Sequence, residues 1–282
     1  MIEMIRYVFH DFWETVGSSN LSWFPTLKGG PWAILCIIGC YLYFVTNLGP
    51  RLMKNREPFE LRSILLVHNI IKIILYSIVL ILGSWCIDGG SKATKCELFN
   101  FDGDDLKTRI TISIGLEYYL LKYFDLMDTI YFVLKKKTSQ VTSAHLIHHS
   151  LMPLLFYVAY KFCPSLHLGL IPIVNSFIHF LTATYHIICT IDPSRKHIYR
   201  NWARYLFHLQ MIQFVFFIII FLNMVYLMED CPCSTLLASF SICVTTIFLV
   251  LNVVSWLKIG SLICVPNMHI DSQKEINKSK VN

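Results

Sequence analysis

The chain has 282 residues, of which 55% are hydrophobic and only 15% are charged, and its formal net charge at pH 7 is +6. Soluble domains carry about 25% charged residues, so this composition excludes an ordinary soluble domain and indicates a membrane protein. No polar stretch is long enough for a second core, so we expect one domain over residues 1–260 and a polar tail over residues 261–282. The first residues lack the basic and apolar regions of a cleaved signal peptide.

Seven apolar stretches are long enough to cross a bilayer, whose hydrocarbon core requires about 20 helical residues. We therefore predict an all-α polytopic membrane protein with seven transmembrane helices. In chain order, the predicted spans cover residues 31–48, 64–83, 111–134, 145–160, 166–188, 205–227 and 236–257.

The basic residues are distributed unevenly between the predicted loops. Most of them fall in residues 49–62, 135–137, 192–204 and the tail, which lie on one side of the membrane if there are seven spans. By the positive-inside rule this is the cytosolic side, so we expect the N-terminus in the lumen. Asn20 then begins a lumenal glycosylation sequon. The final sequence NKSKVN is either a solvated tail or a dilysine-type retrieval signal, and the second interpretation predicts the endoplasmic reticulum membrane.

The third predicted span contains three charged residues. Lys122, Asp125 and Asp128 are spaced three apart and therefore share one helical face. A charge near the bilayer centre costs about 2.5–3.5 kcal/mol on insertion scales, so each of them needs a partner. One interpretation is a structural pair between Lys122 and Asp125 near the membrane surface. The other is a polar site that is shared with neighbouring spans.

Three further spans carry polar residues at a similar depth, in the cytosolic half of the membrane. They are His145, His148 and His149 in span four, Asn175, His179 and His186 in span five, and Gln210 and Gln213 in span six. Helices that merely pack together have no reason to hold polar groups at one depth, so we predict a functional site. His68, His167 and His208 stand alone and are interpreted as hydrogen-bonded structural residues.

Two kinds of chemistry use such a cluster. Histidines bind iron in membrane di-iron enzymes, but the single H-x-x-H-H motif here provides fewer ligands than such a centre needs. Alternatively, a neutral imidazole attacks a thioester to form an acyl-imidazole, which requires a site that excludes water because it hydrolyses readily. The residues alone leave both chemistries open, the first as a metal-dependent lipid desaturase or hydroxylase. A non-catalytic seven-span protein is a third interpretation.

The sequences KYFDLMDTIYFVLKKK, QVTSAHLIHHS, NSFIHFLTATYH and LQMIQF follow one another in the order and spacing of the fatty acid elongase family. The sequence YLYFVTNLGPRLMKNREPFELR resembles that family's first cytosolic segment, so the likeness covers about residues 41–258. It implies that spans two to seven form an inverted barrel around a substrate tunnel. It also implies condensation of a long-chain acyl-CoA with malonyl-CoA to a 3-ketoacyl-CoA, carbon dioxide and CoA, the first step of very-long-chain fatty acid elongation. With this chemistry we expect no metal and no cofactor.

The resemblance also assigns roles to individual residues. His148 is the expected acyl-accepting nucleophile, His179 assists proton transfer or polarises the malonyl group, and Asp128, His145 and His149 complete the catalytic set. The implied substrate-binding residues are Lys122, Asp125, Asn175, Gln210 and Gln213 in the site, and Lys135, Lys136, Lys137, Tyr185 and Arg204 for CoA. Expected partners are the bilayer, the reductases and dehydratase of the elongation cycle and a second copy in a homodimer, with no nucleic acid.

Among the cysteines in or near the predicted lumenal loops, where disulfides persist, are candidates for pairing. These are Cys86, Cys96, Cys231 and Cys233, and their pairing cannot be deduced from the sequence alone. The family resemblance implies a disulfide between Cys96 and Cys231.

Some residues depart from the family pattern. Asp125 replaces a glutamate, and Phe207 replaces a threonine. Thr182, Ala183 and His186 lie where the family has other residues, with the loss of two large side chains and the gain of an imidazole. These changes leave the acyl chain preference open, although QVT, MP and IQF resemble the branch that acts on long and polyunsaturated chains.

Overall fold

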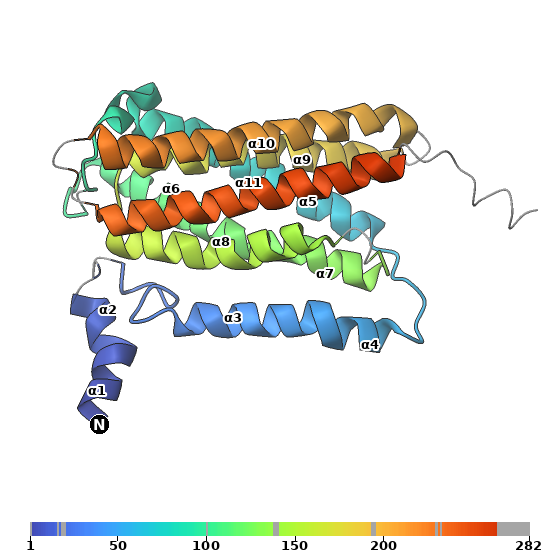
Figure 1. The fold of residues 1–282 in the computed structure, drawn as a ribbon, viewed down its shortest axis with the longest axis horizontal. Helices are drawn as coiled ribbons and strands as arrows, with labels where there is room; N and C mark the ends of the chain where they lie inside the picture. Colours follow the sequence, from blue (N-terminus) through green and yellow to red (C-terminus); the bar gives the residue numbers. More distant parts are fainter. Residues whose placement is uncertain are drawn as a thin grey trace, which may run out of the picture.

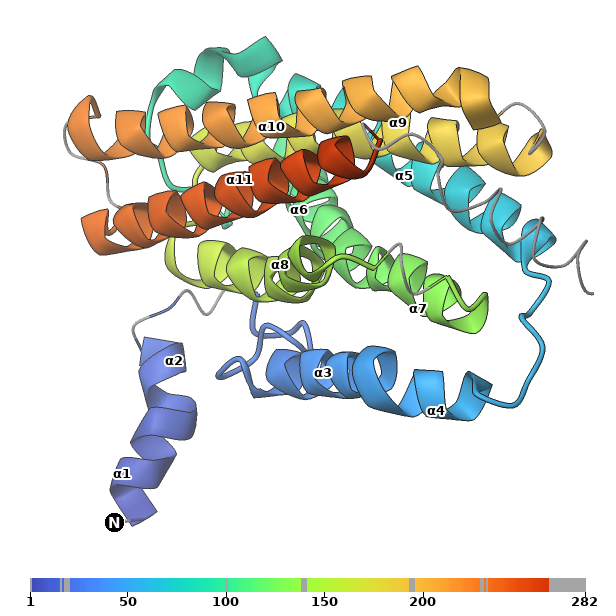
Figure 2. The ribbon, with the colours of Figure 1, turned by 45° about the vertical axis from the view of Figure 1, so that its right-hand side comes forward.

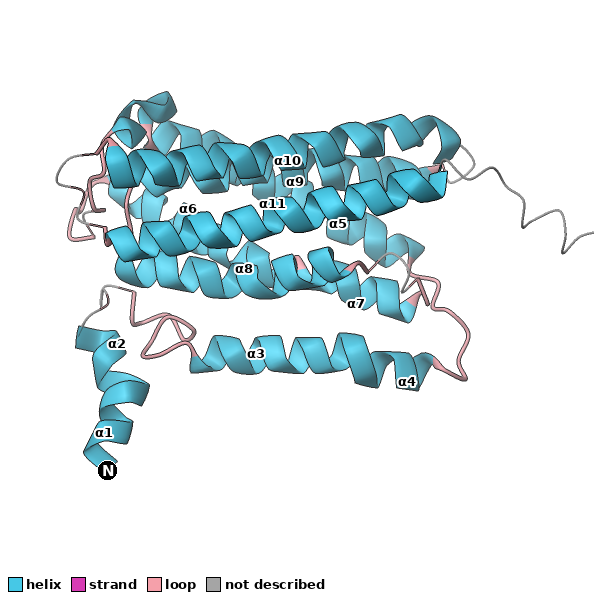
Figure 3. Cartoon of the chain, in the orientation of Figure 1, coloured by secondary structure: helices cyan, strands magenta, loops and turns pink. Residues whose placement is uncertain are grey.

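The computed structural model describes residues 2–15, 17, 21–99, 101–137, 141–192, 196–228, 231 and 233–263. Asn20, most of the predicted tail and its dilysine-type sequence lie outside the described residues. Within them the fold is helical, as predicted, apart from one isolated bridge between Leu98 and Ser165. Apart from the short helices within residues 2–15, the helices run along a common direction, and most of the loops that join them lie at the two ends of the bundle (Figure 3).

The first part of the chain contains short helices and two helical segments with a wider turn. These elements are α1 (Ile2–Arg6), a π-helical segment (Tyr7–Asp11), α2 (Phe12–Thr15), α3 (Trp32–Tyr43), a second π-helical segment (Phe44–Leu48) and α4 (Gly49–Met53). The bundle itself is built from α5 (Arg62–Cys86), a 3-10 segment (Asp88–Thr94), α6 (Leu106–Phe124), α7 (Leu126–Leu134), α8 (Ser143–Phe162), a 3-10 segment (His167–Gly169), α9 (Leu170–Ile191), α10 (Lys196–Tyr226) and α11 (Thr235–Ile263).

Five helical stretches are long and apolar enough to cross a membrane, which is consistent with a polytopic membrane protein. They are Trp32–Met53, Arg62–Cys86, His167–Ile191, Asn201–Tyr226 and Thr235–Leu257, and they match predicted spans one, two, five, six and seven. The helices at predicted spans three and four carry the charged residues and the histidine motif, which lower their apolar character. The count of seven spans therefore stays a prediction.

The third predicted span is not one continuous helix, so the prediction of a single helix over 111–134 is wrong. α6 ends at Phe124 and α7 begins at Leu126, with Asp125 in the turn between them. The amide of Asp128 donates to the carbonyl of Asp125 at 3.2 Å, a three-residue spacing that is tighter than that of an α-helix. Contacts of the Asp125 side chain with other helices accompany this break, and no Gly or Pro in the sequence marks it.

Neighbouring helices pack around the centre of the bundle in pairs. α5 packs against α6 and α9, α10 packs against α9 and α11, and α8 packs against α6 and α11. α3 and α4 lie along one side, next to α8 and α7, while α1 and α2 extend away from the bundle (Figures 1 and 2). The largest side chains with no exposed surface are tyrosines at positions 76, 118, 119 and 157, so the core is aromatic as well as aliphatic.

Side-chain caps fix the start of two of the helices that carry site residues, α6 and α8. The Asp105 carboxylate accepts a hydrogen bond from the Thr108 amide at 3.1 Å at the start of α6. The Thr142 hydroxyl accepts one from the His145 amide, also at 3.1 Å, at the start of α8. Such caps satisfy amide groups that have no partner within the helix. The cap at Thr142 therefore sets the histidine motif on the first two turns of α8.

Two disulfides lie at one end of the bundle, here called the cysteine-rich end. Cys96 is joined to Cys231, the pair that the family resemblance implies, with 5.1 Å between their Cα atoms. A second disulfide, which the sequence did not predict, joins Cys163 to Cys233. Together they connect the segment before α6, the end of α8 and the segment between α10 and α11 (Figure 1).

A buried ion pair also lies at the cysteine-rich end. The Lys161 ammonium, on a side chain that is 2% exposed, lies 3.2 Å from a carboxylate oxygen of Glu14. Glu14 also accepts hydrogen bonds from the Gly29 amide and the Ser22 hydroxyl. Burial alone would raise the pKa of Glu14, but these hydrogen bonds and the Lys161 ammonium lower it below its usual value of 4.5. The N-terminal segment is therefore attached to α8 by charge as well as by packing.

Candidate active site

The two carboxylates at the junction of α6 and α7 meet basic side chains from α5. The Lys72 ammonium lies 2.9 Å from Oδ1 of Asp125 and 2.6 Å from Oδ2 of Asp128. Nε2 of His68 lies 3.0 Å from Oδ1 of Asp128. Neither Lys72 nor His68 was assigned to the site from the sequence. His68 is hydrogen-bonded, as its interpretation as a structural residue requires, but its partner is a site residue.

Lys122 joins the site through an amide network on α9 and α10. Its ammonium donates to Oδ1 of Asn175 at 2.9 Å, and Nδ2 of Asn175 donates to Oε1 of Gln213 at 3.3 Å. Its distance to Asp125 is longer, 3.4 Å. The Tyr118 hydroxyl also donates to Asn175, at 2.7 Å. Lys122 therefore forms part of a network across three helices, and the alternative of a simple pair with Asp125 near the surface does not describe its contacts.

The four histidines of the predicted catalytic set form a chain of neighbouring rings from α8 to α9. The ring centroids of His145 and His149 are 4.3 Å apart, those of His148 and His149 are 5.2 Å apart, and those of His149 and His179 are 6.4 Å apart. The ring of His179 stacks on Tyr76, and its Nδ1 lies 3.7 Å from Oδ1 of Asp125. The histidine motif and the carboxylates thus converge in one place.

Two of these rings have further contacts that distinguish them. Nε2 of His145 lies 3.1 Å from the Thr129 hydroxyl on α7. His148 is 6% exposed, and its ring lies edge-on to Phe214 and Phe248, with centroid distances of 5.7 and 4.9 Å. His148 is therefore the member of the cluster that faces apolar surroundings.

A polar cavity of about 550 Å³ adjoins the carboxylate side of the cluster. Asp128 belongs both to the histidine and carboxylate cluster and to the wall of this cavity, so the cluster borders the cavity. Among the residues that line the cavity are Arg62, Lys135, Lys137, Tyr185 and His186. Its basic side chains and its volume suit a ligand that carries phosphate groups.

Three of the predicted substrate-binding residues lie apart from this arrangement. Lys136 is exposed, and its ammonium points to the carbonyl oxygen of Lys54 at 3.4 Å. Arg204 is not among the described residues that line the polar cavity. Gln210 is half-buried, and the structure shows no hydrogen bond that joins it to the other described site residues.

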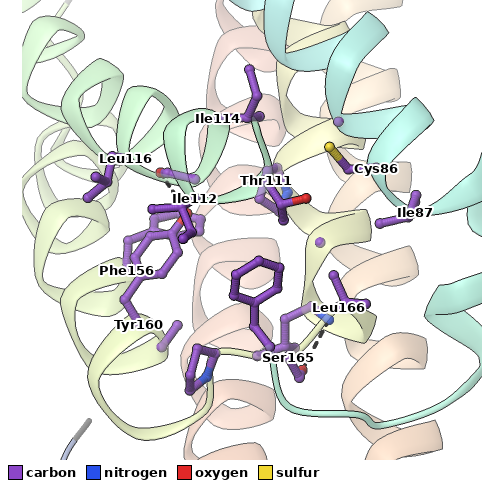
Figure 4. Close-up of a pocket in the computed structure, with 18 of the residues that line it drawn as sticks. Cys86, Ile87, Thr111, Ile112, Ile114, Leu116, Phe156, Tyr160, Ser165 and Leu166 are labelled. Carbon is purple, nitrogen blue, oxygen red and sulfur yellow. Dashed lines mark hydrogen bonds between the residues drawn. The ribbon is translucent and has the colours of Figure 1, made fainter. Parts of the chain in front are cut away.

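Two apolar cavities lie on the other side of the cluster. One, the His148 cavity, has a volume of about 90 Å³ and is lined by His148 and by residues of α8, α9, α10 and α11. The other, the cysteine-end cavity, has about 120 Å³ and is lined by α5, α6, α8, α9 and the loop after α8. Figure 4 shows Phe156 and Tyr160 on one side of it with Ile112 and Leu116, facing Cys86 across the space.

The two apolar cavities share part of their walls. Phe156, Ala159 and Leu168 line both of them. Unfilled apolar cavities of this size cost about 2–3 kcal/mol each at about 24 cal/mol per Å³. They also stay dry, because they offer water too few polar partners. Hydrocarbon is the ligand that suits such spaces.

The fold and the site together define a polytopic membrane protein in which buried histidines and paired carboxylates separate a basic polar cavity from apolar ones. Residues 26–258 match the model of the GNS1/SUR4 family, named ELO, and the chain belongs to this family.

Named relatives support this assignment. The chain is 34% identical over 210 residues to very long chain fatty acid elongase 7 of Rattus norvegicus, which covers 73% of this chain and 72% of that protein. It is 36% identical to very long chain fatty acid elongase 7 of Drosophila melanogaster over 67% of this chain and 57% of that protein. It is 30% identical to very long chain fatty acid elongase 1 of Mus musculus over 73% and 72% of the two chains.

Proposed function

We propose that this chain condenses a long-chain acyl-CoA with malonyl-CoA, giving a 3-ketoacyl-CoA, carbon dioxide and CoA, as the first step of very-long-chain fatty acid elongation. The names of the relatives support fatty acid elongation. The position of His148 carries the proposal, because its ring lines an apolar cavity and also contacts His149 in the polar cluster. A nucleophile in this position reaches a thioester at the boundary between an acyl chain and its CoA.

In the first half-reaction, His148 takes the acyl group. A ring nitrogen of His148 attacks the thioester carbon, the carbon–sulfur bond breaks, and the departing CoA thiolate takes the proton that the imidazole loses. The acyl chain lies in the apolar cavities. These cavities exclude water, so the acyl-imidazole survives until the second substrate binds.

In the second half-reaction, malonyl-CoA loses carbon dioxide and its C2 carbon attacks the acyl carbonyl. The carbon–nitrogen bond to His148 breaks, and His179, which has taken up one proton from solvent, supplies the proton that the released ring takes up. The Asp125 carboxylate lies 3.7 Å from Nδ1 of His179 and stabilises the ring when it carries a proton. The network of Lys122, Asn175 and Gln213 supports the malonyl thioester, with Gln210 at its edge. His145, His149 and Asp128 hold the rings of His148 and His179 in place. No metal or cofactor takes part in the proposed reaction.

The polar cavity is the proposed site of the CoA part of both substrates. Lys135 and Lys137 line it with Tyr185 and provide the charge for the CoA phosphates. Lys136 and Arg204 do not line the cavity, so we assign them a role through their long-range charge.

We also propose that seven spans cross the endoplasmic reticulum membrane and that the last six form a barrel around the substrate. The closed order of packing, from α5 through α9, α10, α11, α8 and α6 back to α5, supports the barrel. The two disulfides support a lumenal position for the cysteine-rich end, since disulfides persist in that compartment. The N-terminus is then lumenal and the tail cytosolic. The product needs reduction and dehydration, so reductases and a dehydratase are proposed partners, and a homodimer is the proposed assembly.

The test is incorporation of labelled malonyl-CoA by the purified protein, with acyl-CoA acceptors of varied length and unsaturation. We expect chain-extended 3-ketoacyl products from the wild type and none from His148→Ala. If the folded wild type extends no acceptor while a verified elongase works alongside, the proposal fails. A metal-dependent desaturase is the alternative, and stoichiometric iron in the purified protein with oxidised products would establish it instead.

A further inference from the structure

We propose that Lys72 is a positioning residue for the second half-reaction, in which it holds Asp125 in line with His179. This inference rests on the proposed function and names a residue that the comparison with the elongase motifs does not include. Lys72 lies on α5, whereas the predicted catalytic and substrate-binding residues lie between the start of α6 and the end of α10. Its role follows from what its ammonium contacts.

Lys72 is a buried cation between two carboxylates. The residue is 4% exposed, and its ammonium lies 2.9 Å from Asp125 and 2.6 Å from Asp128. A buried ammonium is stable only when it is paired, and two carboxylates held this close repel each other unless a cation lies between them. Lys72 therefore fixes the positions of both carboxylates relative to α5.

The contacts of Asp125 explain why its position matters. Its Oδ1 atom is the one that faces both Lys72 and Nδ1 of His179. Its Oδ2 atom accepts a hydrogen bond from the Tyr76 hydroxyl at 2.6 Å and lies 3.4 Å from Lys122. Without the Lys72 ammonium, no lysine on α5 would attract Oδ1 of Asp125, and repulsion would turn the Asp125 carboxylate away from Asp128. His179 would then lose the carboxylate that faces its Nδ1 atom.

His148 does not depend on these contacts. Its ring lies against Phe214 and Phe248 and lines the His148 cavity. Lys72 contacts the carboxylate that faces His179, on the other side of the cluster. A change at Lys72 is therefore expected to slow condensation and to leave transfer of the acyl group to His148 intact.

The experiment measures the two half-reactions separately in the full-length protein. Release of CoA from an acyl-CoA in the absence of malonyl-CoA, followed as the initial burst per folded chain, reports acylation of His148. Incorporation of labelled malonyl-CoA reports condensation. For Lys72→Met we expect a burst within about twofold of wild type and condensation at least about tenfold slower. This is less than the roughly 10²–10⁴-fold that a positioned acid–base group contributes, because Lys72 acts on His179 only through Asp125. Lys72→Arg keeps the charge and should recover part of the condensation rate.

Lys161→Met is the matched control. Lys161 is also a buried lysine paired with a carboxylate, but it lies at the cysteine-rich end with Glu14. We expect it to lower thermal stability and to leave the ratio of condensation to CoA release unchanged in the folded fraction.

Every other result contradicts either the role of Lys72 or the proposed function. Condensation at the wild-type rate in Lys72→Met, or equal loss of both half-reactions in folded protein, overturns the role of Lys72. If Lys72→Met does not fold, the comparison is made with Lys72→Arg, whose condensation should fall more than its CoA release; a proportional loss overturns the role. A wild type that neither releases CoA nor condenses would refute the proposed function instead.

Discussion

Phe156 lies between the two apolar cavities, and we predict that replacing it changes the length of the acyl chain that the protein extends. Along α8, Phe156 is eight residues from His148, or about 12 Å at 1.5 Å per residue. An extended hydrocarbon advances about 1.25 Å per carbon, from bonds near 1.52 Å and angles near 111°. A chain attached to His148 therefore reaches Phe156 after about ten carbons.

Phe156→Ala removes the largest side chain that separates the His148 cavity from the cysteine-end cavity. Cys163, on the far side of the second cavity, is fifteen residues from His148, or about 22 Å along the helix. The joined space gains room for about eight more carbons by the same arithmetic. We expect the preferred acceptor to become longer, while Ala159→Leu, which fills the shared wall, should make it shorter. Phe156→Ala should also lower stability by about 3–5 kcal/mol, as is typical of this change in a core.

The assay is a competition among saturated acyl-CoA acceptors of stepped length, with labelled malonyl-CoA and separation of the products by chain length. Folded protein is confirmed for each variant by size-exclusion chromatography and thermal melting. The reasoning is refuted if the length profiles of Phe156→Ala and Ala159→Leu both match the wild type, or if both move in the same direction.

Three further predictions follow from the site and the cysteine-rich end. His179→Ala should still release CoA from acyl-CoA in a burst but should fail to condense, and loss of the burst in folded protein would contradict the separate roles of His148 and His179. Cys163→Ser opens a crosslink between residues 70 apart; chain entropy alone puts the cost at up to about 4 kcal/mol, visible as a lower melting temperature, and a wild-type melt would contradict a structural role. The lowered pKa of Glu14 means that its charged form contributes stability above its unfolded value near 4.5 and that this contribution is lost as the pH falls through the folded value. Glu14→Gln should therefore melt below wild type at pH 7 and approach it in acid, and a constant difference across this range would contradict the ion pair.

The position of the site was predictable from the sequence because two simple rules applied. Residues three or four apart share a helix face, which grouped His145, His148 and His149 on α8. The alternation of spans across the membrane then put them at the depth of Asn175 and His179. Both rules depend only on spacing and span order, and the structure brings these residues within one network.

The partners of these residues were not predictable in the same way. His68, Lys72 and Tyr76 are spaced four apart on an apolar helix and therefore share one face. That polar face was the available sign that α5 contributes to the site. The direction in which the face points depends on how α5 is rotated against α6 and α9, which hydrophobic spacing does not determine in a helix that is apolar nearly all round. The break at Asp125 is likewise a result of tertiary contact.

The second disulfide shows a different limit. Cys163 lies directly after α8, between predicted spans four and five, so the predicted topology puts it on the lumenal side with the other disulfide cysteines. Its partner Cys233 is two residues from Cys231, and sequence spacing alone allows Cys96 to pair with Cys231 or with Cys233. The packing of α8 against α11 brings Cys163 to Cys233, and only the folded chain contains that information.

The central claim is that His148 carries the fatty chain covalently, and the most direct measurement is mass spectrometry of the protein after brief exposure to an acyl-CoA without malonyl-CoA. The account predicts an increase equal to one acyl group, mapped to the peptide that contains His148 and lost when malonyl-CoA is added. An acyl group on another residue, or rapid elongation with no adduct detectable at any time before malonyl-CoA is added, would contradict it.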